Sequence, residues 1–418
     1  MYKLAFLFPG QGSQYIGMGK ALWEEFNAAK LTFAEANDAL GYDITKICFE
    51  GGVRELNRHE HMLPAILTVS VAAFRVYLEE IGIEPAFLAG HSLGEYSALT
   101  CAGALPFADA IRLVRKRSLL AASVRSGAMS VLNGVMKEQV SEACRLFSTE
   151  KEAIALACDN GRDQFVISGH AAGVQRVEDY FLEQSMQVTP LLTTPPFHSP
   201  LMAHAATELE AELNKLSFRP LQYAVIANVT GRPYEGAERI VPYLTRQLTD
   251  TVQWTKTIDF LQEQGVELVV EMGPQAVLTN LVTANTTIEA MSYGQREDRL
   301  QLRERLAAPA FDPHVPTVVT RCLAMAVATR NRNKDADAYR QGVIVTYDQL
   351  ERLQGELEAA RRFPSEVEMR QALEWLSQIM RTKGVPEEEE KRRIEKVLSD
   401  TGMTERLSDI FSKEETAC

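Results

Sequence analysis

The sequence predicts an open, mainly parallel α/β sheet, a small domain inserted into it, and a helical segment that follows. Two observations predict the sheet: continuous apolar runs of strand length at Leu4–Phe8 and Phe87–Ala89, and a Gly-rich turn with a helical pattern directly after each. Such runs are typical of parallel strands covered on both faces. A third observation, a change of pattern between about residues 127 and 194, predicts the insertion.

The elements of the main sheet follow in chain order. After the first strand the chain turns at Pro9–Gln14, and after the second it turns at Gly90–Gly94, where good helix formers follow Ser92. A third strand is expected at Val266–Met272, before a Gly-Pro pair. Strands that alternate with helical patterns favour a parallel sheet with helices on its faces.

The inserted segment has the order β-α-β-β-α-β, which is typical of a ferredoxin-like domain. We expect strands at Ala128–Leu132, Ile154–Ala157, Phe165–Ser168 and Val188–Leu192, and helices at Lys137–Leu146 and Ala172–Gln184.

The C-terminal part turns helical and charged after about Tyr293. Ser365, with Glu368 three residues later, forms a capping-box pattern that predicts a helix start. An apolar stripe at helical spacing follows, and residues 387–393 then set acids four residues before bases, as on an exposed helix face. The stripe consists of Leu373, Leu376 and Met380. The expected domains are 1–126 with 199–295 for the sheet, 127–198 for the insertion and 296–418 for a helical extension.

Composition excludes several classes of protein. The 418 residues are 46% hydrophobic and 24% charged, which excludes disorder, collagen-like repeats and a disulfide scaffold. Because the net charge is -12, we do not expect the protein to bind nucleic acid. We expect no apolar stretch of membrane-spanning length, and the short N-terminal run is not typical of a secretion signal. The six cysteines lie far apart, so we expect buried reduced thiols in a cytoplasmic protein.

A serine nucleophile is indicated by Gly90-His91-Ser92-Leu93-Gly94, which fits the G-x-S-x-G pattern at a strand-to-helix junction. Glycines on both sides of Ser92 allow a sharp turn that lifts its hydroxyl above the sheet edge. The backbone N–H of Leu93 opens a helix, where free donors can stabilise an oxyanion. A tight packing turn is the plain alternative for so short a pattern.

Serine needs a base, and seven histidines are available. His59 and His61 lie in a polar stretch and are expected at the surface, whereas His91 neighbours the nucleophile and is expected to point away. His198 follows a proline-rich stretch where the insertion returns to the sheet, a place where clefts form. The spacing leaves both His198 and His170 open as the base.

Six separate blocks resemble the malonyl-CoA:acyl-carrier-protein transacylase family. They cover about residues 1 to 290 in the family's order, and are Gly10–Gln14, Gly90–Tyr96, Phe197-His198, Asn228–Gly231, Gln247–Trp254 and Glu271–Pro274. The resemblance implies an α/β-hydrolase-like sheet domain, and acyl transfer with no metal or organic cofactor. Malonyl-CoA and a holo acyl carrier protein are the implied partners, without nucleic acid or membrane.

The resemblance also implies the roles of the site residues. Ser92 carries the acyl group as an ester, and His198 acts as general base and then as general acid. A backbone carbonyl at Gln247 orients the histidine. The backbone N–H groups of Gln11 and Leu93 form the oxyanion hole, although Gln11 in a Gly-rich loop also fits a plain turn residue.

Arg117 matches the family's arginine for the free carboxylate of malonate. A guanidinium has the planar, two-pronged geometry that a buried carboxylate needs. Its neighbours Arg112, Arg115 and Lys116 are expected to form an exposed basic helix stretch.

Two positions bear on the acyl group. Phe197 stands where malonyl-selective polyketide members of the family usually carry phenylalanine, and a bulky ring there disfavours an extra methyl by about 1–3 kcal/mol. Leu63 replaces a glutamine found in many relatives before Pro64-Ala65, which bears on the polarity of the acyl chamber.

The extension after residue 296 lies outside the resemblance and carries no catalytic pattern. Long extensions resemble those of stand-alone acyltransferases that serve polyketide or hybrid peptide-polyketide synthases in trans. A helical appendage that contacts the synthase and a purely structural addition are both consistent with it. The alternatives for the whole chain are a hydrolase that removes stray acyl groups from carrier proteins and a silent scaffold that binds them. Arg117 disfavours the hydrolase, and the complete residue set disfavours the scaffold.

Overall fold

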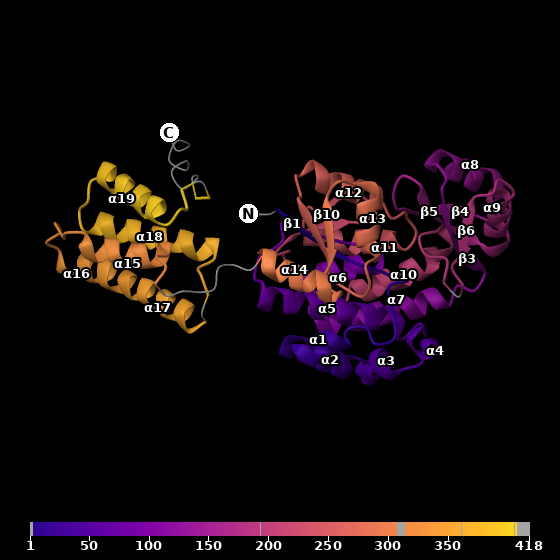
Figure 1. The fold of residues 1–418 in the computed structure, drawn as a ribbon, viewed down its shortest axis with the longest axis horizontal. Helices are drawn as coiled ribbons and strands as arrows, with labels where there is room; N and C mark the ends of the chain where they lie inside the picture. The colour runs from indigo at the N-terminus through magenta and orange to yellow at the C-terminus, as the bar shows by residue number, and fades with distance from the viewer. Residues whose placement is uncertain (1–2, 193, 307–313, 361, 405, 408–418) are drawn as a thin grey trace. The chain divides into compact units, whose positions relative to one another are not determined.

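A six-stranded sheet, of which β1 and β10 are labelled in Figure 1, forms the centre of the N-terminal part of the chain. Its strand order is β10-β9-β1-β2-β7-β8. The computed structural model describes residues 3–192, 194–306, 314–360, 362–404 and 406–407. The chain divides into two units, Met1–Ala307 and Ala308–Cys418. Each unit is described by itself.

The sheet places the carboxyl ends of β1 and β2 side by side. All neighbouring strands are parallel except β7 and β8, which are antiparallel. The strands are β1 Leu4–Phe8, β2 Phe87–Gly90, β7 Ala224–Ala227, β8 Arg232–Pro233, β9 Leu268–Glu271 and β10 Glu289–Ser292. Loops after adjacent parallel strands meet at one edge, which is where open α/β sheets bind ligands.

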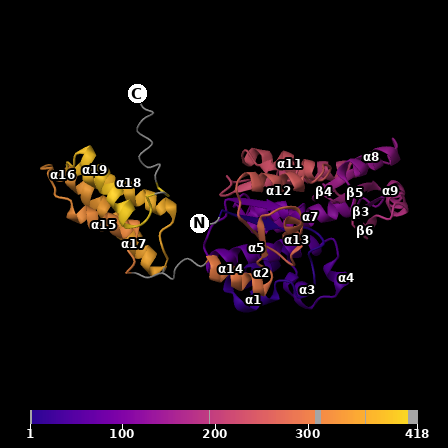
Figure 2. The same ribbon diagram turned by 45° about the horizontal axis from the view of Figure 1, so that its top comes forward.

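Helices cover both faces of this sheet. Figure 2 shows α11 and α12 on one side of the unit and α1, α2 and α14 on the other. The helices are α1 Lys20–Glu25, α2 Asn27–Leu40, α3 Ile44–Glu50, α4 Val53–Leu56, α5 Met62–Glu80, α6 Leu93–Cys101, α7 Phe107–Ala122, α10 Ala203–Leu213, α11 Ile240–Gln247, α12 Trp254–Glu263, α13 Val277–Asn285 and α14 Arg296–Leu306, with 3₁₀ turns at Pro200–Met202 and Ala237–Arg239. The predicted parallel α/β class is confirmed.

Helix α5 corrects the expectation that no apolar stretch is long enough to span a membrane. Among the described residues it is the one helix long and apolar enough, with a mean hydropathy of 1.5, and 83% of its apolar window is buried inside the protein. It packs against α2, α6 and α7. A helix enclosed by others is apolar on all sides, which explains its composition.

The insertion forms the predicted β-α-β-β-α-β order. Its separate four-stranded sheet has the order β4-β5-β3-β6, with antiparallel neighbours. The elements are β3 Gly127–Asn133, α8 Lys137–Phe147, β4 Ile154–Asp159, β5 Gln164–His170, α9 Ala171–Glu183 and β6 Gln187–Pro190. This subdomain has a small apolar core of its own, which includes Phe165 and Phe181.

The expected boundary before residue 296 is one helix too early, because α14 belongs to the first unit. Leu302 and Leu306 are buried in the core of that unit. Arg299 lies 2.9 Å from Glu25 on α1. This ion pair joins segments more than 270 residues apart, and no local pattern reveals it.

The second unit is a helical bundle with its own apolar core. Its helices are α15 Val318–Ala328, α16 Ala336–Tyr339, α17 Val345–Ala359, α18 Glu366–Thr382 and α19 Glu387–Asp400, with a π-helical turn at Arg340–Ile344. Ser365 and Glu368 form the predicted capping box, and the predicted apolar stripe of α18 is buried.

The acid-base run of α19 is only partly the exposed face that the sequence indicates. Glu389 pairs with Arg393 at 2.6 Å, as expected. Arg392 instead donates to the backbone carbonyl of Glu388, and Glu390 is buried against Ser377 and Arg381 of α18. The helix turns one acid into the bundle because α18 offers it two donors.

Five of the six cysteines are free and buried, as predicted. They are Cys48, Cys101, Cys144, Cys158 and Cys322. Cys418 lies outside the described residues.

Candidate active site

Ser92 occupies a sharp, strained turn between β2 and α6. Its backbone has φ 52° and ψ -104°, a conformation that is uncommon for a residue with a side chain. A Cβ on Gly90 would lie 1.9 Å from the backbone of Gly94, and a Cβ on Gly94 would lie 1.8 Å from the carbonyl oxygen of Phe8. Both glycines of the G-x-S-x-G pattern are therefore required by this close approach.

Asn228 holds the turn from the neighbouring strand. Its Oδ1 accepts from the N–H of Ser92 at 2.7 Å, and its Nδ2 donates to the carbonyl of Gly90 at 2.6 Å. The side chain is buried, and it follows β7, which pairs with β2. In the sequence Asn228 is only part of a family block, and no role is predicted for it. A polar residue directly after a buried strand was the available signal.

His198 lies within hydrogen-bond reach of the serine. Its Nε2 is 2.8 Å from Ser92 Oγ, and its Nδ1 is 2.6 Å from the carbonyl oxygen of Gln247. Because a carbonyl only accepts, Nδ1 carries the proton and Nε2 is left to accept from the serine hydroxyl. Burial, with the nearby Arg117 cation, lowers the pKa of His198 to about 3. The imidazole is therefore neutral in the empty site.

The other histidines differ from expectation in part. His170 lies at the end of β5, outside the residues that line the pocket, which leaves His198 as the histidine on the serine. His61 is buried rather than exposed, because its Nδ1 pairs with the carbonyl of Glu55. His59 and His91 both line the pocket. His91 does not turn away: its Nε2 is 2.7 Å from Asn160 of the inserted subdomain.

Arg117 is a buried cation beside the serine. Only 1% of it is exposed, and its Nη2 donates to Ser92 Oγ at 3.2 Å and to Gln247 Oε1 at 3.3 Å. The guanidinium lies 4.5 Å from the ring centre of Phe197 and 5.4 Å from that of Tyr96, within cation–π range. Its Nε has no hydrogen-bond partner among the described residues. A buried guanidinium with an unused donor suits an anionic group.

Two of the three basic neighbours of Arg117 are exposed, as expected. Arg112 and Lys116 are exposed, whereas Arg115 is half-buried over the ring of Tyr42.

Gln247 connects the histidine, the serine and the arginine. Beyond its carbonyl contact with His198, its Nε2 donates to the carbonyl oxygen of Ser92 at 2.9 Å and to Glu95 Oε2 at 2.6 Å. It is fully buried at the end of α11. The sequence indicated only its backbone carbonyl.

The loop after β1 lies against the start of α6, where the oxyanion hole was predicted. A Cβ on Gly10 would be 3.8 Å from the backbone nitrogen of Leu93, so Gln11, the next residue, is close to that helix start. The side chain of Gln11 donates to Thr194 Oγ1 at 3.0 Å.

A pocket of about 540 Å³ opens over Ser92 and His198, between the sheet domain and the inserted subdomain. Ser92, His198, Phe197 and Gln11 line it, together with apolar residues of the subdomain such as Val131 and Val166. Leu63 is buried in the core, and the adjacent Met62 lines the pocket instead. The leucine therefore fits core packing at this position.

Comparisons with known proteins identify relatives of this chain. Residues 5–299 match the family model for the acyl transferase domain. A Bacillus subtilis protein named malonyl CoA-acyl carrier protein transacylase is 37% identical over 397 residues, which are 94% of this chain and 99% of that protein. The polyketide biosynthesis protein ThaF of Burkholderia thailandensis is 40% identical over 315 residues, 75% of this chain and 27% of that protein.

Among solved structures, one similar chain belongs to a complex of a type II polyketide synthase acyl-carrier protein with its malonyl-transacylase. The TM-score is 0.70 at 37% identity, and the match covers 72% of this chain and 99% of that one. The similarity to the Bacillus subtilis protein thus extends into the second unit, whereas the similarity to this solved structure covers less of the chain.

Proposed function

Because this chain belongs to the acyl transferase family, as its sequence motifs indicated, we propose that it moves a malonyl group from malonyl-CoA to the phosphopantetheine thiol of an acyl carrier protein. The observation that carries the proposal is the contact of Ser92 with both His198 and the buried Arg117. A nucleophile that contacts both its base and a fixed cation matches a substrate with a thioester at one end and a carboxylate at the other.

In the first half-reaction Ser92 Oγ attacks the thioester carbonyl while its proton passes to His198 Nε2. The backbone N–H groups of Leu93 and Gln11 stabilise the oxyanion. Collapse of the tetrahedral intermediate breaks the carbon–sulfur bond, and the imidazolium gives its proton to the leaving thiolate of coenzyme A. The malonyl group is then an ester on Ser92.

The second half-reaction runs these steps in reverse with a new thiol. His198 takes the proton of the phosphopantetheine thiol, whose sulfur attacks the ester, and the proton returns to Ser92 Oγ. The acyl donor malonyl-CoA and the acceptor phosphopantetheine thiol use the same pocket in turn, so ping-pong kinetics are expected. No metal or organic cofactor takes part in this scheme.

The malonyl carboxylate also prepares the base. Arg117 is one of the charges that lower the pKa of His198 in the empty site. A carboxylate bound to the guanidinium offsets that charge, so malonyl binding makes His198 a stronger base. Phe197, packed on the guanidinium, narrows the space beside the acyl α-carbon and disfavours branched acyl groups.

We further propose that the enzyme supplies malonyl units in trans to a polyketide or hybrid synthase. The support is Phe197, the similarity to ThaF, and the second unit, which the Bacillus subtilis relative shares. Truncation after residue 306, which keeps α14 with its own core, tests this role. Lower acylation on an intact synthase, with unchanged acylation of isolated carrier protein, supports it, and equal retention of both activities contradicts it.

Intact-mass measurement tests the transfer itself. After mixing with malonyl-CoA, the protein should gain one malonyl group, and Ser92→Ala should not. Addition of holo carrier protein should move that mass to the carrier. Loss of the group to water before transfer would instead show the acyl hydrolase, and no adduct at all would leave only a carrier-binding scaffold.

A further inference from the structure

Glu95 is a buried carboxylate that the reaction scheme does not use. It lies in the first turn of α6, three residues after the nucleophile, and is 0% exposed. Its Oε2 accepts from Gln247 Nε2 at 2.6 Å, and its Oε1 accepts from the hydroxyl of Tyr234 at 2.5 Å. Gln247 in turn reaches Arg117 at 3.3 Å. A carboxylate, an amide and a guanidinium from three different helices thus form one buried chain.

The carboxylate fixes which way the amide of Gln247 points. An amide has one accepting oxygen and one donating nitrogen. Because Glu95 and the carbonyl of Ser92 both accept, the nitrogen must face them, and the oxygen is left for Arg117. Without an acceptor at position 95 the amide could turn its nitrogen toward the guanidinium, where two donors would repel. Glu95 thereby holds the guanidinium through an intermediate residue.

The same carboxylate faces the arginine's charge inside the protein. The titratable and charged groups around it are Tyr234 after β8, Arg117 on α7 and Tyr96 on its own helix, with Tyr243 of α11 behind Tyr234. Burial raises the pKa of Glu95 to about 7, against the lowering effect of its hydrogen bonds and of Arg117. Gain or loss of its proton is therefore accessible near neutral pH.

We propose that Glu95 is the positioning residue and counter-charge of the acyl-carboxylate site: through Gln247 it holds Arg117 while the site is empty, and it takes up a proton from solvent when the carboxylate of the acyl group binds. The inference rests on the proposed function, since it needs a carboxylate at Arg117. A second anion in the same buried space makes the ionised form of Glu95 unfavourable. Binding of malonyl-CoA is then linked to proton uptake, and binding of acetyl-CoA is not.

Calorimetry measures this linkage directly. In a full-length Ser92→Ala background, which stops transfer, the heat of binding is measured in two buffers of different ionisation enthalpy. At about pH 7.5 malonyl-CoA should take up about half a proton or more per site, and acetyl-CoA should take up none. Adding Glu95→Gln should abolish the uptake. That substitution keeps the shape and the contact to Gln247, because the Tyr234 hydroxyl can accept as well as donate.

Glu271→Gln is the matched control. Glu271 is also fully buried, and burial also raises its pKa to about 7. It accepts from the backbone N–H groups of Leu278 and Thr279 at the start of α13, rather than from the network that contains Arg117. Its replacement should leave the malonyl-linked uptake as in the parent. If Glu95→Gln does not fold, Tyr234→Phe serves instead: loss of a donor raises the proton affinity of Glu95 and moves the uptake to higher pH.

The outcomes separate this inference from the proposed function. Uptake that persists in Glu95→Gln, that appears equally with acetyl-CoA, or that is absent while malonyl-CoA binds overturns the role of Glu95 only. Failure of the wild-type protein to acquire a malonyl group on Ser92 overturns the proposed function first. Steady-state kinetics give a second reading: the KM for malonyl-CoA should rise between about pH 6 and pH 8 in the wild type and stay level in Glu95→Gln.

Discussion

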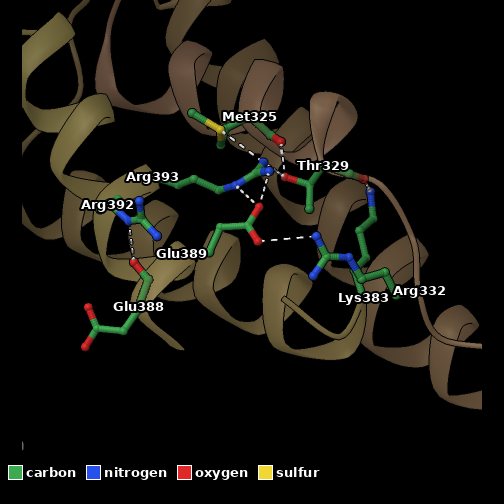
Figure 3. A network of polar contacts seen from close by, with 8 residues as sticks. All are labelled: Met325, Thr329, Arg332, Lys383, Glu388, Glu389, Arg392 and Arg393. Atoms are coloured by element: carbon green, nitrogen blue, oxygen red, sulfur yellow. Dashed lines mark hydrogen bonds and ion pairs between the residues drawn. The ribbon is translucent and has the colours of Figure 1, made fainter. Parts of the chain in front are cut away.

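The two units treat buried charge in different ways. In the helical unit Lys383 is buried, and its Nζ donates to the carbonyl of Ala326 at 2.7 Å. It also donates to the carbonyl of Thr329 at 3.0 Å (Figure 3). These carbonyls lie at the end of α15, where a cation also meets the negative end of the helix dipole. Glu390 is satisfied in the same local way by Ser377 and Arg381. Such charges stabilise packing.

In the catalytic unit the buried ionisable groups keep hydrogen-bond donors or protonation sites that the protein itself does not use. Arg117 contacts a hydroxyl and an amide rather than a carboxylate, and keeps an unused donor. His198 is neutral because it is buried beside a cation, and the pKa of Glu95 lies near 7. Incomplete satisfaction of buried polar groups, rather than burial itself, thus marks the place where a ligand completes the network.

The largest expected effect comes from His198→Ala. Removal of the base leaves Ser92 with no acceptor for its proton, so kcat for malonyl transfer should fall about 10⁴-fold. Stopped-flow formation of the malonyl-enzyme measures this directly. His170→Ala, which changes the rival histidine outside the pocket, should leave the rate within about twofold. An equal loss in both variants would contradict the assignment of the base.

Arg117→Ala should separate the two acyl groups. A buried carboxylate without its partner costs about 3–5 kcal/mol, so kcat/KM for malonyl-CoA should fall about 100-fold or more. Acetyl transfer should be spared or improved, because loss of the cation also raises the basicity of His198. Competition of the two thioesters in one mixture gives the ratio. If both substrates decline together, Arg117 is a packing cation like Lys383.

Asn228→Ala should lower kcat while KM changes little. The amide holds the backbone of the strained Ser92 turn on both sides, and loss of two buried hydrogen bonds costs about 1–3 kcal/mol. The nucleophile then spends less time in position, and a 10- to 100-fold decrease in kcat is expected at roughly constant substrate affinity. A change confined to KM would place Asn228 in binding instead.

The sequence revealed those features of the site that local patterns encode. The glycines around Ser92, the strand Leu4–Phe8 and the order of the insertion depend on neighbouring residues, and each was predicted. The base could not be chosen from spacing, because His198 and His170 both lie more than 75 residues from the serine. The family resemblance, rather than periodicity, selected His198, Arg117 and the Gln247 carbonyl.

The rest depends on contacts between distant segments. Asn228 and Gln247 reach the Ser92 turn across 136 and 155 residues, and Tyr234 reaches Glu95 across 139. The sequence predicts helix α14 in the wrong unit, because the ion pair that joins it to α1 connects residues 274 positions apart. Short strands such as β7 and β10 are not predicted, because four residues carry little periodicity.

The pH dependence gives a smaller but sharper contrast. With the pKa of His198 near 3, its neutral form is present throughout the range above about pH 4, so the imidazole should give no acid limb near its ordinary value. In Glu95→Gln, where the other titrating group is absent, kcat/KM for malonyl-CoA should stay level from about pH 5 to pH 7. An acid limb near pH 6.5 in that variant would show that burial does not control the histidine.

The smallest expected effect on activity comes from Lys383→Met in the helical unit. Two carbonyls at the end of α15 lose a charged donor, so the free energy of unfolding of this unit should fall by about 1.5–3 kcal/mol. Acylation of isolated carrier protein should be unchanged, because the unit forms its own core. Lys396→Met, at an exposed position of α19, is the control and should change stability by less than about 0.5 kcal/mol. A loss of transfer activity in Lys383→Met alone would mean that the satisfied charge also serves the reaction, and that completeness of a buried network does not separate packing from function.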